Sequence, residues 1–406
     1  MNKSKNLLFV TWDSESTNYL ESLFFPIFKG LQEKGGIRVH VMQFSWASQI
    51  EVQRLTDLAA SLDITYIQHP IHRKPVASIG AFWSIYQGTF YIKRYIQEHQ
   101  IEILMPRSTM PAMMVNRLWA WLRRQPISLV FDADGFPLEE RVDYVGLDPM
   151  GRQYRFLKNE EKKILHRSHK VLTRSKRAME IHLANIGISQ RDKFCVVGNG
   201  RDSKIFQPDL ESRLRIRQEL GIMDKDLLWV YTGTVGPQYM VDEMLRLFEK
   251  HHLAHPNSKF LILTRNPGYV EERIPSNLQN FVVIKNGAYS EIPFYLSAAD
   301  LGLSLRKSAP SLAGIAPIKL GEYFLCGLPV IASSGVGDTE EMLKDKDFCF
   351  LMDSSGDELF TVRFQEWIGG LTKLDKGKIR DFGMERFSLE KSVESYLVML
   401  NDKKRM

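Results

Sequence analysis

The sequence contains very little cysteine, and this scarcity excludes two kinds of site. Only Cys195, Cys326 and Cys349 occur among 406 residues, far apart and odd in number. There is no C-x-x-C pair and no Cys/His cluster, so the pattern predicts neither a disulfide framework nor a zinc site. We expect buried free thiols in a reducing compartment.

Long apolar runs are also lacking. No stretch approaches the ~20 apolar residues that span a bilayer. The run 7–10 near the N-terminus is too short for the apolar region of a signal peptide. There is no low-complexity tract, and a composition of 44% hydrophobic and 25% charged residues is typical of a globular protein. We therefore expect a cytoplasmic protein.

The net charge of +6 is unevenly distributed along the chain. Residues 1–205 hold 29 Lys and Arg against 20 Asp and Glu, whereas the remainder holds 25 against 28. A basic first half favours an anionic partner, such as anionic lipid at the inner face of the cell membrane or a phosphate-bearing acceptor. No nucleic-acid recognition motif is present, so we expect no nucleic-acid partner.

Short apolar segments alternate with longer amphipathic ones along the whole chain, which predicts an α/β protein with parallel sheets covered on both faces. In the first half, helical patterns over 19–34, 79–99 and 111–124 separate the predicted strands. These strands are 7–11, 38–44, 64–69, 101–106, 127–131, 170–173 and 194–197.

The second half repeats this alternation, so a chain of this length is predicted to form two doubly wound domains. Helices are expected over 240–252 and 292–298, and the strands over 227–233, 260–264, 281–285, 301–305, 329–333 and 348–352. The polar interval 199–220, which carries Gly200, Pro208 and a charged helix, is the best candidate for a linker. We place the domains at 1–205 and 206–384, with a C-terminal helix within 385–406. The default active site is a cleft between two such domains.

Residues 301–331 carry the strongest functional signal. A strand leads into a loop with Arg306 and Lys307, and a helix is predicted to begin near Pro317 and to end at Cys326-Gly327. The free N–H groups of a helix N-terminus favour an anion, and Lys319 adds a positive charge in the first turn. Glu322 lies three residues later on the same side of the helix, where a carboxylate can accept two hydrogen bonds from a ribose diol.

This segment, from Pro317-Ile318-Lys319-Leu320-Gly321-Glu322-Tyr323 to Cys326-Gly327-Leu328-Pro329, resembles the nucleotide-sugar site of group 1 (family 4-like) glycosyltransferases. Val197-Gly198-Asn199-Gly200 and Trp229–Gly233 resemble further segments of that family. The resemblance implies a GT-B fold of two Rossmann-like domains. It also implies a UDP- or GDP-sugar donor, retention of anomeric configuration, no required metal or cofactor, and often a terminal helix that returns to the first domain.

The chain departs from the family pattern at several positions. Gly314 stands where the family usually has a first glutamate that contacts the donor sugar, although relatives with a Pro-x-Lys-Leu-x-Glu-Tyr segment also lack it. The basic residues that usually follow Gly233 are replaced by Thr234 and its neighbours. We expect Arg306, Lys307 and Lys319 to substitute for them. The expected donor-binding residues are Gly233, Thr234, Arg265, Lys285, Asn286, Arg306, Lys307, Gly314, Ala316, Pro317, Ile318, Lys319 and Glu322.

In the first domain, carboxylates follow the predicted strand 127–131. Asp132, Asp134 and Glu140 are candidates for orienting the acceptor hydroxyl, the transferred sugar or a proton. One alternative is a solvated Asp/Gly turn, and another is that Asp132-Ala133-Asp134 is an Asp-x-Asp metal motif. The two periodic halves of the chain favour no metal.

Two stretches, 86–95 and 118–124, mix aromatic with basic residues and include Trp119, Trp121, Arg123 and Arg124. Such stretches suit a membrane interface. Core packing of crossover helices is the alternative that we favour, because a doubly wound sheet needs covering at both places.

The sequence thus predicts a glycosyltransferase that moves a sugar to a glycan or lipid-linked saccharide acceptor in cell-surface polysaccharide synthesis. A nucleotide-sugar 2-epimerase of the same architecture and a non-catalytic donor-binding scaffold subunit remain alternatives.

Overall fold

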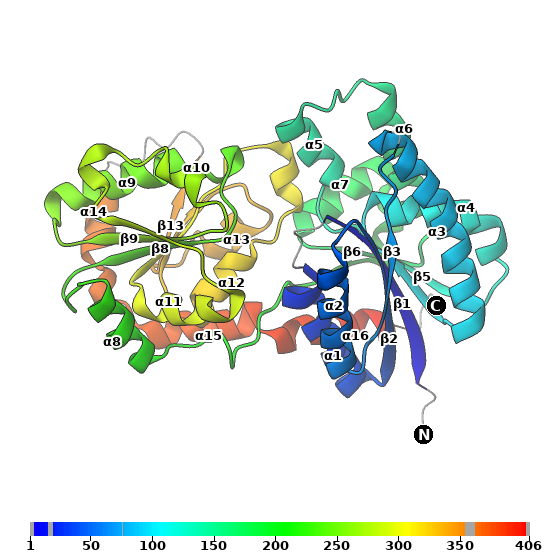
Figure 1. Cartoon of the computed structure of the whole chain (residues 1–406), viewed down its shortest axis with the longest axis horizontal. Helices are drawn as coiled ribbons and strands as arrows, with labels where there is room; N and C mark the ends of the chain where they lie inside the picture. Colours follow the sequence, from blue (N-terminus) through cyan, green and yellow to red (C-terminus); the bar gives the residue numbers. More distant parts are fainter. Residues whose placement is uncertain (1–3, 15–18, 75, 354–361, 403–406) are drawn as a thin grey trace. The chain divides into compact units, whose positions relative to one another are not determined.

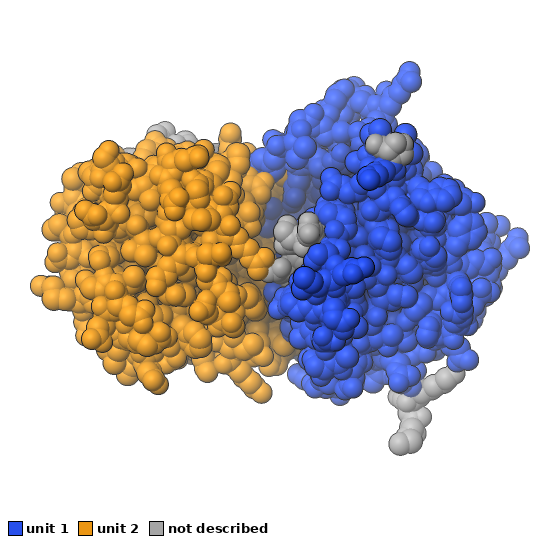
Figure 2. Space-filling model, viewed as in Figure 1, with its two compact units in different colours: residues 1–198, 313–315, 392–406 blue, residues 199–312, 316–391 orange. Residues whose placement is uncertain are grey.

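A computed structural model describes residues 4–14, 19–74, 76–353 and 362–402. The chain folds into two compact units, coloured separately in Figure 2. Unit 1 comprises Met1–Gly198, Ala313–Ile315 and Ser392–Met406, and unit 2 comprises Asn199–Leu312 and Ala316–Lys391. The domain limits expected from the sequence, at 205 and 384, remain predictions. The last four residues of the expected C-terminal segment lie outside the described part of the chain.

Unit 1 is built on a seven-stranded parallel sheet in the order β3-β2-β1-β4-β5-β6-β7 (Figure 1). Strands added outward on both sides of β1 define a doubly wound sheet. The strands are β1 (Lys5–Asp13), β2 (Ile37–Ser45), β3 (Thr65–Pro70), β4 (Ile103–Pro106), β5 (Ser128–Asp132), β6 (Lys170–Thr173) and β7 (Phe194–Val196).

Helices cover both faces of this sheet, because the apolar residues of each strand alternate between two cores. On β1, Phe9 packs against Phe24 and Phe28, whereas Leu8 and Val10 face the core beneath α3 and α4. The helices are α1 (Phe25–Gly35) preceded by η1 (Leu20–Phe24), α2 (Gln49–Ser61), α3 (Ala77–His99), α4 (Thr109–Leu122), α5 (Pro137–Val145), α6 (Arg152–Arg167), α7 (Lys176–Ile186), η2 (Ile188–Lys193) and the C-terminal α16 (Leu389–Asn401).

Unit 2 repeats the same design with a six-stranded parallel sheet in the order β10-β9-β8-β11-β12-β13. Trp229 and Tyr231 of β8 face one core, and Leu228 and Val230 face the other. The strands are β8 (Leu228–Thr232), β9 (Lys259–Leu263), β10 (Val282–Lys285), β11 (Leu301–Ser304), β12 (Val330–Ser333) and β13 (Cys349–Met352).

The helices of unit 2 include several short 3₁₀ turns, and one of these, η6, ends with residues that belong to unit 1. They are α8 (Leu210–Glu219), η3 (Pro237–Tyr239), α9 (Val241–Ala254), α10 (Pro267–Glu271), η4 (Ser276–Leu278), η5 (Tyr289–Glu291), α11 (Ile292–Ala298), η6 (Pro310–Gly314), α12 (Ile318–Leu325), α13 (Thr339–Leu343), α14 (Val362–Gly369), η8 (Leu371–Lys373) and α15 (Lys376–Phe387).

The strands expected from the sequence are confirmed in both units. Each expected strand overlaps an observed one, and the helices expected over 79–99, 111–124, 240–252 and 292–298 are also present. The two-domain α/β fold class is likewise confirmed. Among the described residues, no helix is both long enough and apolar enough to cross a membrane.

The polar interval 199–220 was expected to be a linker that carries a charged helix. The helix is present as α8, but it packs against α11 within unit 2. Arg213 and Arg217 of α8 both form ion pairs with Asp300, each at 2.8 Å. The guanidinium group of Arg217 also donates to the Ala298 carbonyl. The charged residues of the expected linker therefore form ion pairs within unit 2.

The C-terminal helix α16 packs against α1 in unit 1. A side chain at Gly30 would collide with Val393, and one at Gly35 would collide with Leu397, at 2.4 Å in both cases. Two glycines on α1 thus let α16 approach closely. This approach also brings Tyr396 to the end of β6, where it contacts Arg174.

Replacement of Gly302 by alanine is expected to destabilise unit 2. The added Cβ would lie 2.6 Å from the Tyr323 ring, which cannot move freely because its hydroxyl is hydrogen bonded. Overpacking of this kind costs about 1–3 kcal/mol, or about 2–4 °C in Tm for each kcal/mol in a domain of this size. Scanning calorimetry measures the shift. Gly268→Ala is the control, since its Cβ would meet no atom within 4 Å, and equal Tm values for the two variants would contradict the packing argument.

Candidate functional site

The N-terminus of α12 in unit 2 is positioned by the loop that follows β11. Pro317 occupies the N-cap position with extended backbone, and no side chain caps the helix. The helix ends at Cys326, and Gly327 follows with φ +72°. The boundaries expected from the sequence are therefore confirmed, and this helix start presents N–H groups of the kind that bind anions.

Lys319 extends from the first turn of α12 between two tyrosine rings. Its Nζ lies 4.4 Å from the ring centroid of Tyr231 and 4.7 Å from that of Tyr239, and it donates to the Tyr231 hydroxyl at 2.9 Å. The Tyr231 hydroxyl in turn donates to the Thr234 carbonyl. Gly233 has φ +116°, and a Cβ there would lie 2.8 Å from Cε of Lys319. Glycine is needed at 233 both for its backbone conformation and for the space that the lysine uses.

Arg306 brings a second positive charge near Lys319, and among the described residues no carboxylate forms an ion pair with this lysine. Burial lowers the pKa of Lys319 well below its ordinary value, and nearby Arg306 lowers it further, while Glu322 raises it. The Arg306 guanidinium stacks over the Tyr239 ring at 4.3 Å. Cation–π contacts thus hold both cations in place while leaving their charge available to an anionic ligand.

Glu322 lies one turn further along α12 and is buried. Its Oε1 accepts a hydrogen bond from Nε of Arg201 at 3.0 Å. Burial raises the pKa of the Glu322 carboxyl, whereas Arg201 and then Lys319 lower it. A carboxylate can accept several hydrogen bonds, and the Arg201 N–H uses one of these positions. Other lone pairs of Glu322 can therefore accept hydrogen bonds from ligand hydroxyls.

Arg201 is placed by the backbone of the segment between α15 and α16. Its N–H donates to the Phe387 carbonyl, and its carbonyl accepts from the Leu389 N–H, each at 2.8 Å. Two backbone hydrogen bonds therefore fix the residue whose side chain orients Glu322. Although the sequence contains Arg201 directly after the Asn199-Gly200 motif, we did not predict its role.

Tyr323 ties α12 to the ends of two central strands. Its hydroxyl accepts from the Thr232 N–H at 3.1 Å and donates to the Leu303 carbonyl at 3.2 Å. The first of these residues ends β8, and the second lies near the end of β11. This buried bridge fixes the first turns of α12, which carry Lys319 and Glu322.

The other expected donor-binding residues of unit 2 are arranged around this helix start. Arg306 follows β11, and its N–H donates to the Ser333 hydroxyl, while the Lys307 N–H donates to the Gln238 carbonyl. Ala316, Pro317 and Ile318 are half-buried residues that lead into α12, and Thr234 is exposed. Arg265 follows β9, Lys285 ends β10 and Asn286 follows it, and both strands lie further from β11 in the sheet order.

Gly314 belongs to unit 1, unlike the other expected donor-binding residues. A Cβ there would lie 2.7 Å from the Phe136 ring and 3.0 Å from the backbone of Gly135. The neighbouring Ala313 is buried with Phe136, and its carbonyl accepts from the Ser175 hydroxyl at 2.6 Å. In this arrangement a glutamate at 314 does not fit without movement of Phe136, which gives a physical reason for its absence.

The expected carboxylate site of unit 1 lies within a network of buried ion pairs. Asp132 is fully buried at the end of β5 and pairs with Arg174 at 2.6 Å. Arg174 also donates to the Tyr396 hydroxyl at 3.0 Å. Burial raises the pKa of Asp132, and Arg174 opposes that shift. Asp132 is thus buried and paired with an arginine, and the alternative of a solvated turn does not hold for it.

Arg107, which follows β4, joins two further carboxylates of unit 1. It pairs with Asp134 at 2.6 Å and lies 3.8 Å from Asp13 at the end of β1. Asp134 has φ +61°, and its N–H donates to Asp132. The polar residues after β1, β4, β5 and β6 are therefore brought together. Asp13 and Arg107 follow strands just as Asp132 does, so the same sequence signal would have identified them.

Glu140 stands apart from that network on the exposed surface of α5, in the first turn of the helix. The preceding Glu139 accepts hydrogen bonds from Tyr154 and Lys158. Within the part of the chain that the structure describes, no group of three or more His, Cys, Asp or Glu is arranged to hold a metal ion.

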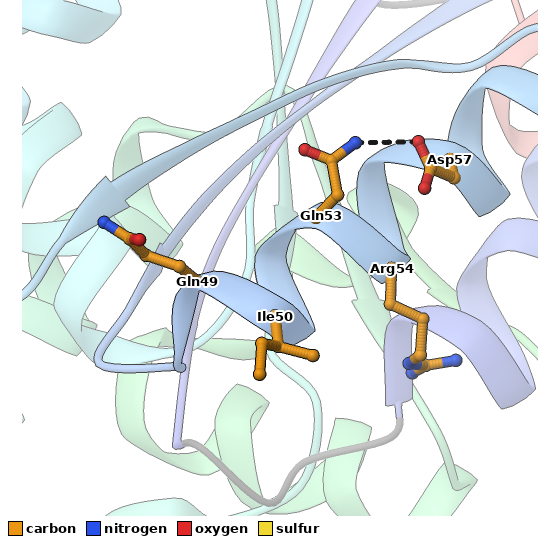
Figure 3. Close-up of a pocket in the computed structure, with 5 residues that line it drawn as sticks. All are labelled: Gln49, Ile50, Gln53, Arg54 and Asp57. Carbon is orange, nitrogen blue, oxygen red and sulfur yellow. Dashed lines mark hydrogen bonds between the residues drawn. The ribbon is translucent and has the colours of Figure 1, made fainter.

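A shallow pocket lies on the surface of α2, remote in sequence from these residues. Figure 3 shows that its lining comes from this one helix, with a hydrogen bond between Gln53 and Asp57. Arg54 there pairs with Glu21 and Glu51. Its polar groups satisfy one another, so we assign it no ligand.

Two Rossmann-like domains, with a loop and helix start after the fourth strand of the second, define the GT-B class of fold. A glycosyltransferase from Rickettsia africae ESF-5 has a TM-score of 0.74 and 16% identity, over 98% of this chain and 100% of that one. Anabaena HepE with UDP and glucose has a TM-score of 0.70 and 15% identity, over 97% and 99%.

A third similar structure is a putative UDP-N-acetylglucosamine 2-epimerase from Listeria monocytogenes. Its TM-score is 0.58 at 12% identity, over 100% of this chain and 98% of that one. Comparison of the sequence with protein-family models and with curated proteins finds no match. At these identities the similar structures establish the fold alone.

The Asp13→Asn variant is expected to gain stability relative to the wild type as pH rises. Burial raises the pKa of Asp13 above its ordinary value of 3.8. The stabilisation from the protonated carboxyl is therefore fully present below pH 3.8 and is lost as pH rises through the folded-state pKa. One amide oxygen can still accept the hydrogen bonds from Thr11 and Gln43 that the aspartate accepts.

Thermal melts of both proteins between about pH 4 and 7 measure this difference. The exposed Asp345→Asn variant is the control and should show no comparable trend. If the difference in Tm between Asp13→Asn and the wild type does not change with pH, the buried environment assigned to Asp13 is wrong.

Proposed function

We propose that this protein is a glycosyltransferase whose second unit binds a nucleoside-diphosphate sugar at the N-terminus of α12. One observation carries the proposal: Lys319 and Glu322 lie one turn apart at an uncapped helix start, beside the glycine loop after β8. A helix N-terminus with a lysine suits a diphosphate. A carboxylate one turn inward suits the two hydroxyls of the adjoining ribose.

The electrostatics of this region support an anionic ligand. Lys319 and Arg306 are held by the faces of Tyr231 and Tyr239, and burial penalises the charge of Lys319 in the free protein. A bound diphosphate supplies the missing negative charge and favours the protonated lysine. The same groups would then stabilise the charge that develops on the departing diphosphate during transfer.

Arg201 is assigned a positioning role in this proposal. Its Nε donates to one oxygen of Glu322, which orients the carboxylate and favours its charged form, while the ribose hydroxyls would donate to other lone pairs. Backbone near Lys285 and Asn286 is proposed to contact the base. Arg265 and Lys307 are proposed as outer contacts to the donor.

For unit 1 we propose that Asp132 and Asp134 act on the acceptor side. Because both carboxylates are paired with buried arginines, they are better suited to orienting hydroxyl groups than to binding a metal ion. Glu140 is the exposed candidate for contact with a saccharide acceptor. Retention of anomeric configuration and transfer without a metal ion belong to the same proposal.

The proposed acceptor is a glycan or a lipid-linked saccharide, and the proposed setting is polysaccharide synthesis in the cytoplasm. The solved HepE complex with UDP and glucose supports a UDP-sugar donor, since that protein shares the fold over nearly the whole chain. The Listeria structure keeps a 2-epimerase as the second candidate.

One nucleoside diphosphate among UDP and GDP is expected to raise the Tm of the protein, with CMP as a third ligand for comparison. Lys319→Met and Glu322→Gln should each weaken binding about tenfold or more, because a charge-assisted hydrogen bond contributes about 1.5–3 kcal/mol. Titration calorimetry gives the affinities. Glutamine can still accept the hydrogen bond from Arg201, so Glu322→Gln tests ligand binding with little change to the fold.

The matched controls are Lys344→Met and Glu340→Gln, two exposed residues next to or within α13. They should bind the nucleotide as the wild type does. Unaltered affinity in both the Lys319 and Glu322 variants would exclude the assigned diphosphate and ribose positions.

The two candidate enzymes differ in their need for an acceptor. A glycosyltransferase should release nucleoside diphosphate from the preferred donor at least about tenfold faster when a saccharide acceptor is added. The reason is that the bound acceptor hydroxyl takes the sugar as the diphosphate leaves. Product analysis by NMR distinguishes the outcomes. Inversion at C2 of the sugar without any acceptor would identify an epimerase, and binding without turnover would identify a non-catalytic subunit.

A further inference from the structure

The helix α3 exposes a row of large apolar side chains. Ile79, Phe82, Trp83, Tyr86 and Phe90 recur at three- and four-residue spacing, and each is between 44% and 57% exposed. Residues at this spacing lie on one face of a helix. Core packing, which we favoured for residues 86–95, is therefore wrong for Tyr86 and Phe90.

The opposite face of α3 carries small residues that fix the orientation of the helix. Gly80, Ser84 and Gly88 are buried and follow one another at four-residue spacing. A Cβ on Gly88 would lie 2.6 Å from the Met114 sulfur, and one on Gly80 would lie 2.2 Å from the His72 carbonyl oxygen. Rotation of α3 would drive aromatic side chains into these contacts, so the aromatic face is held outward by packing.

The exposed rings form one continuous surface. Trp83 stacks on Tyr86 with centroids 5.8 Å apart, and Tyr86 meets Phe90 edge-on at 5.0 Å. Phe82 lies 6.0 Å from the half-exposed Phe156 of α6. We call Ile79, Phe82, Trp83, Tyr86, Phe90 and Phe156 the aromatic surface. Contiguous exposed apolar groups of this kind mark interaction sites on soluble domains.

Basic residues outnumber acidic ones in the chain segments that carry the aromatic surface. Arg117 of α4, the helix that packs beside α3 (Figure 1), lies over the Tyr86 ring at 5.5 Å. Residues 71–124 contain eight Lys and Arg against two Asp and Glu. One of the eight, Arg107, is buried in the ion-pair network. The exposed basic residues of this stretch and of α6 beside Phe156 are Arg73, Lys74, Arg94, Arg117, Arg123, Arg124, Arg152 and Arg155.

We propose that the aromatic surface docks unit 1 on an anionic lipid membrane. Aromatic rings enter the headgroup region while the surrounding Arg and Lys contact lipid phosphates. The charge pattern favours this occupant over a second copy of the chain, because pairing two such surfaces would bring like charges together. It also favours lipid over a neutral glycan, which would gain nothing from the basic residues. Membrane docking here is independent of the donor site in unit 2.

Vesicle flotation with the full chain tests this docking. The wild type should bind vesicles of phosphatidylcholine mixed with phosphatidylglycerol, and bind pure phosphatidylcholine vesicles at least about tenfold less, with weaker binding at high salt. The double variant Trp83→Ser/Phe90→Ser should lose at least about tenfold in affinity for the anionic vesicles. Both side chains are half exposed, so the variant is expected to fold.

Ile188→Ser is the matched control, because Ile188 is an exposed apolar residue of unit 1 that lies outside the aromatic surface. It should bind vesicles as the wild type does. The Arg117→Glu variant should reduce binding to anionic vesicles but leave the small affinity for neutral ones unchanged. Unchanged Tm values, and an unchanged response to nucleotide, establish that each variant is folded.

Several results would overturn membrane docking. These are absence of vesicle binding by the wild type, equal binding to neutral and anionic vesicles, or equal binding by the double variant. A dimer in light scattering that the double variant abolishes, without vesicle binding, would assign the surface to a second copy instead. Retention on an immobilised neutral glycan, without vesicle binding, would assign it to a saccharide.

Discussion

In a parallel sheet every strand ends at the same edge, and the polar residues that follow the strands must share that edge. The two units meet this constraint in different ways. Asp13 and Asp132 end two strands of unit 1, and Arg107 and Arg174 follow two others. Together with Asp134 they form a network of ion pairs at 2.6 to 3.8 Å. Charges at such an edge either find partners within the protein or require a ligand.

Unit 2 stabilises its cations at this edge with aromatic rings. Lys319 lies between Tyr231 and Tyr239, and Arg306 stacks on the latter. A ring face attracts a cation without cancelling its charge, so an anionic ligand at this edge would favour the charged form of Lys319. Glu322 supplies a nearby carboxylate, which is paired with Arg201. This difference is the reason why we propose the donor site in unit 2, while unit 1 offers carboxylates that are already oriented.

Close packing also decides which side chains of α3 are exposed. Gly80 and Gly88 let the helix lie close to its neighbours, so its large side chains have no space in the core and remain outside. A fold that buries small residues and exposes aromatic ones lowers its own stability, since apolar area stays in water. Coverage of this surface by a lipid membrane, as we propose, would remove that apolar area from water.

The sequence by itself determined the strands, most of the helices and the placement of Lys319 and Glu322 on one helix. These features depend on local spacing, which apolar periodicity and turn residues reveal directly. Tertiary structure decided the rest. Arg201 lies 121 positions from Glu322, α8 proved to be a packed helix, and Gly314 joined Phe136 in unit 1. Which face of α3 turned outward depended on contacts with His72 and Met114. Partners so distant in the chain leave no periodic trace in sequence, because only packing brings them together.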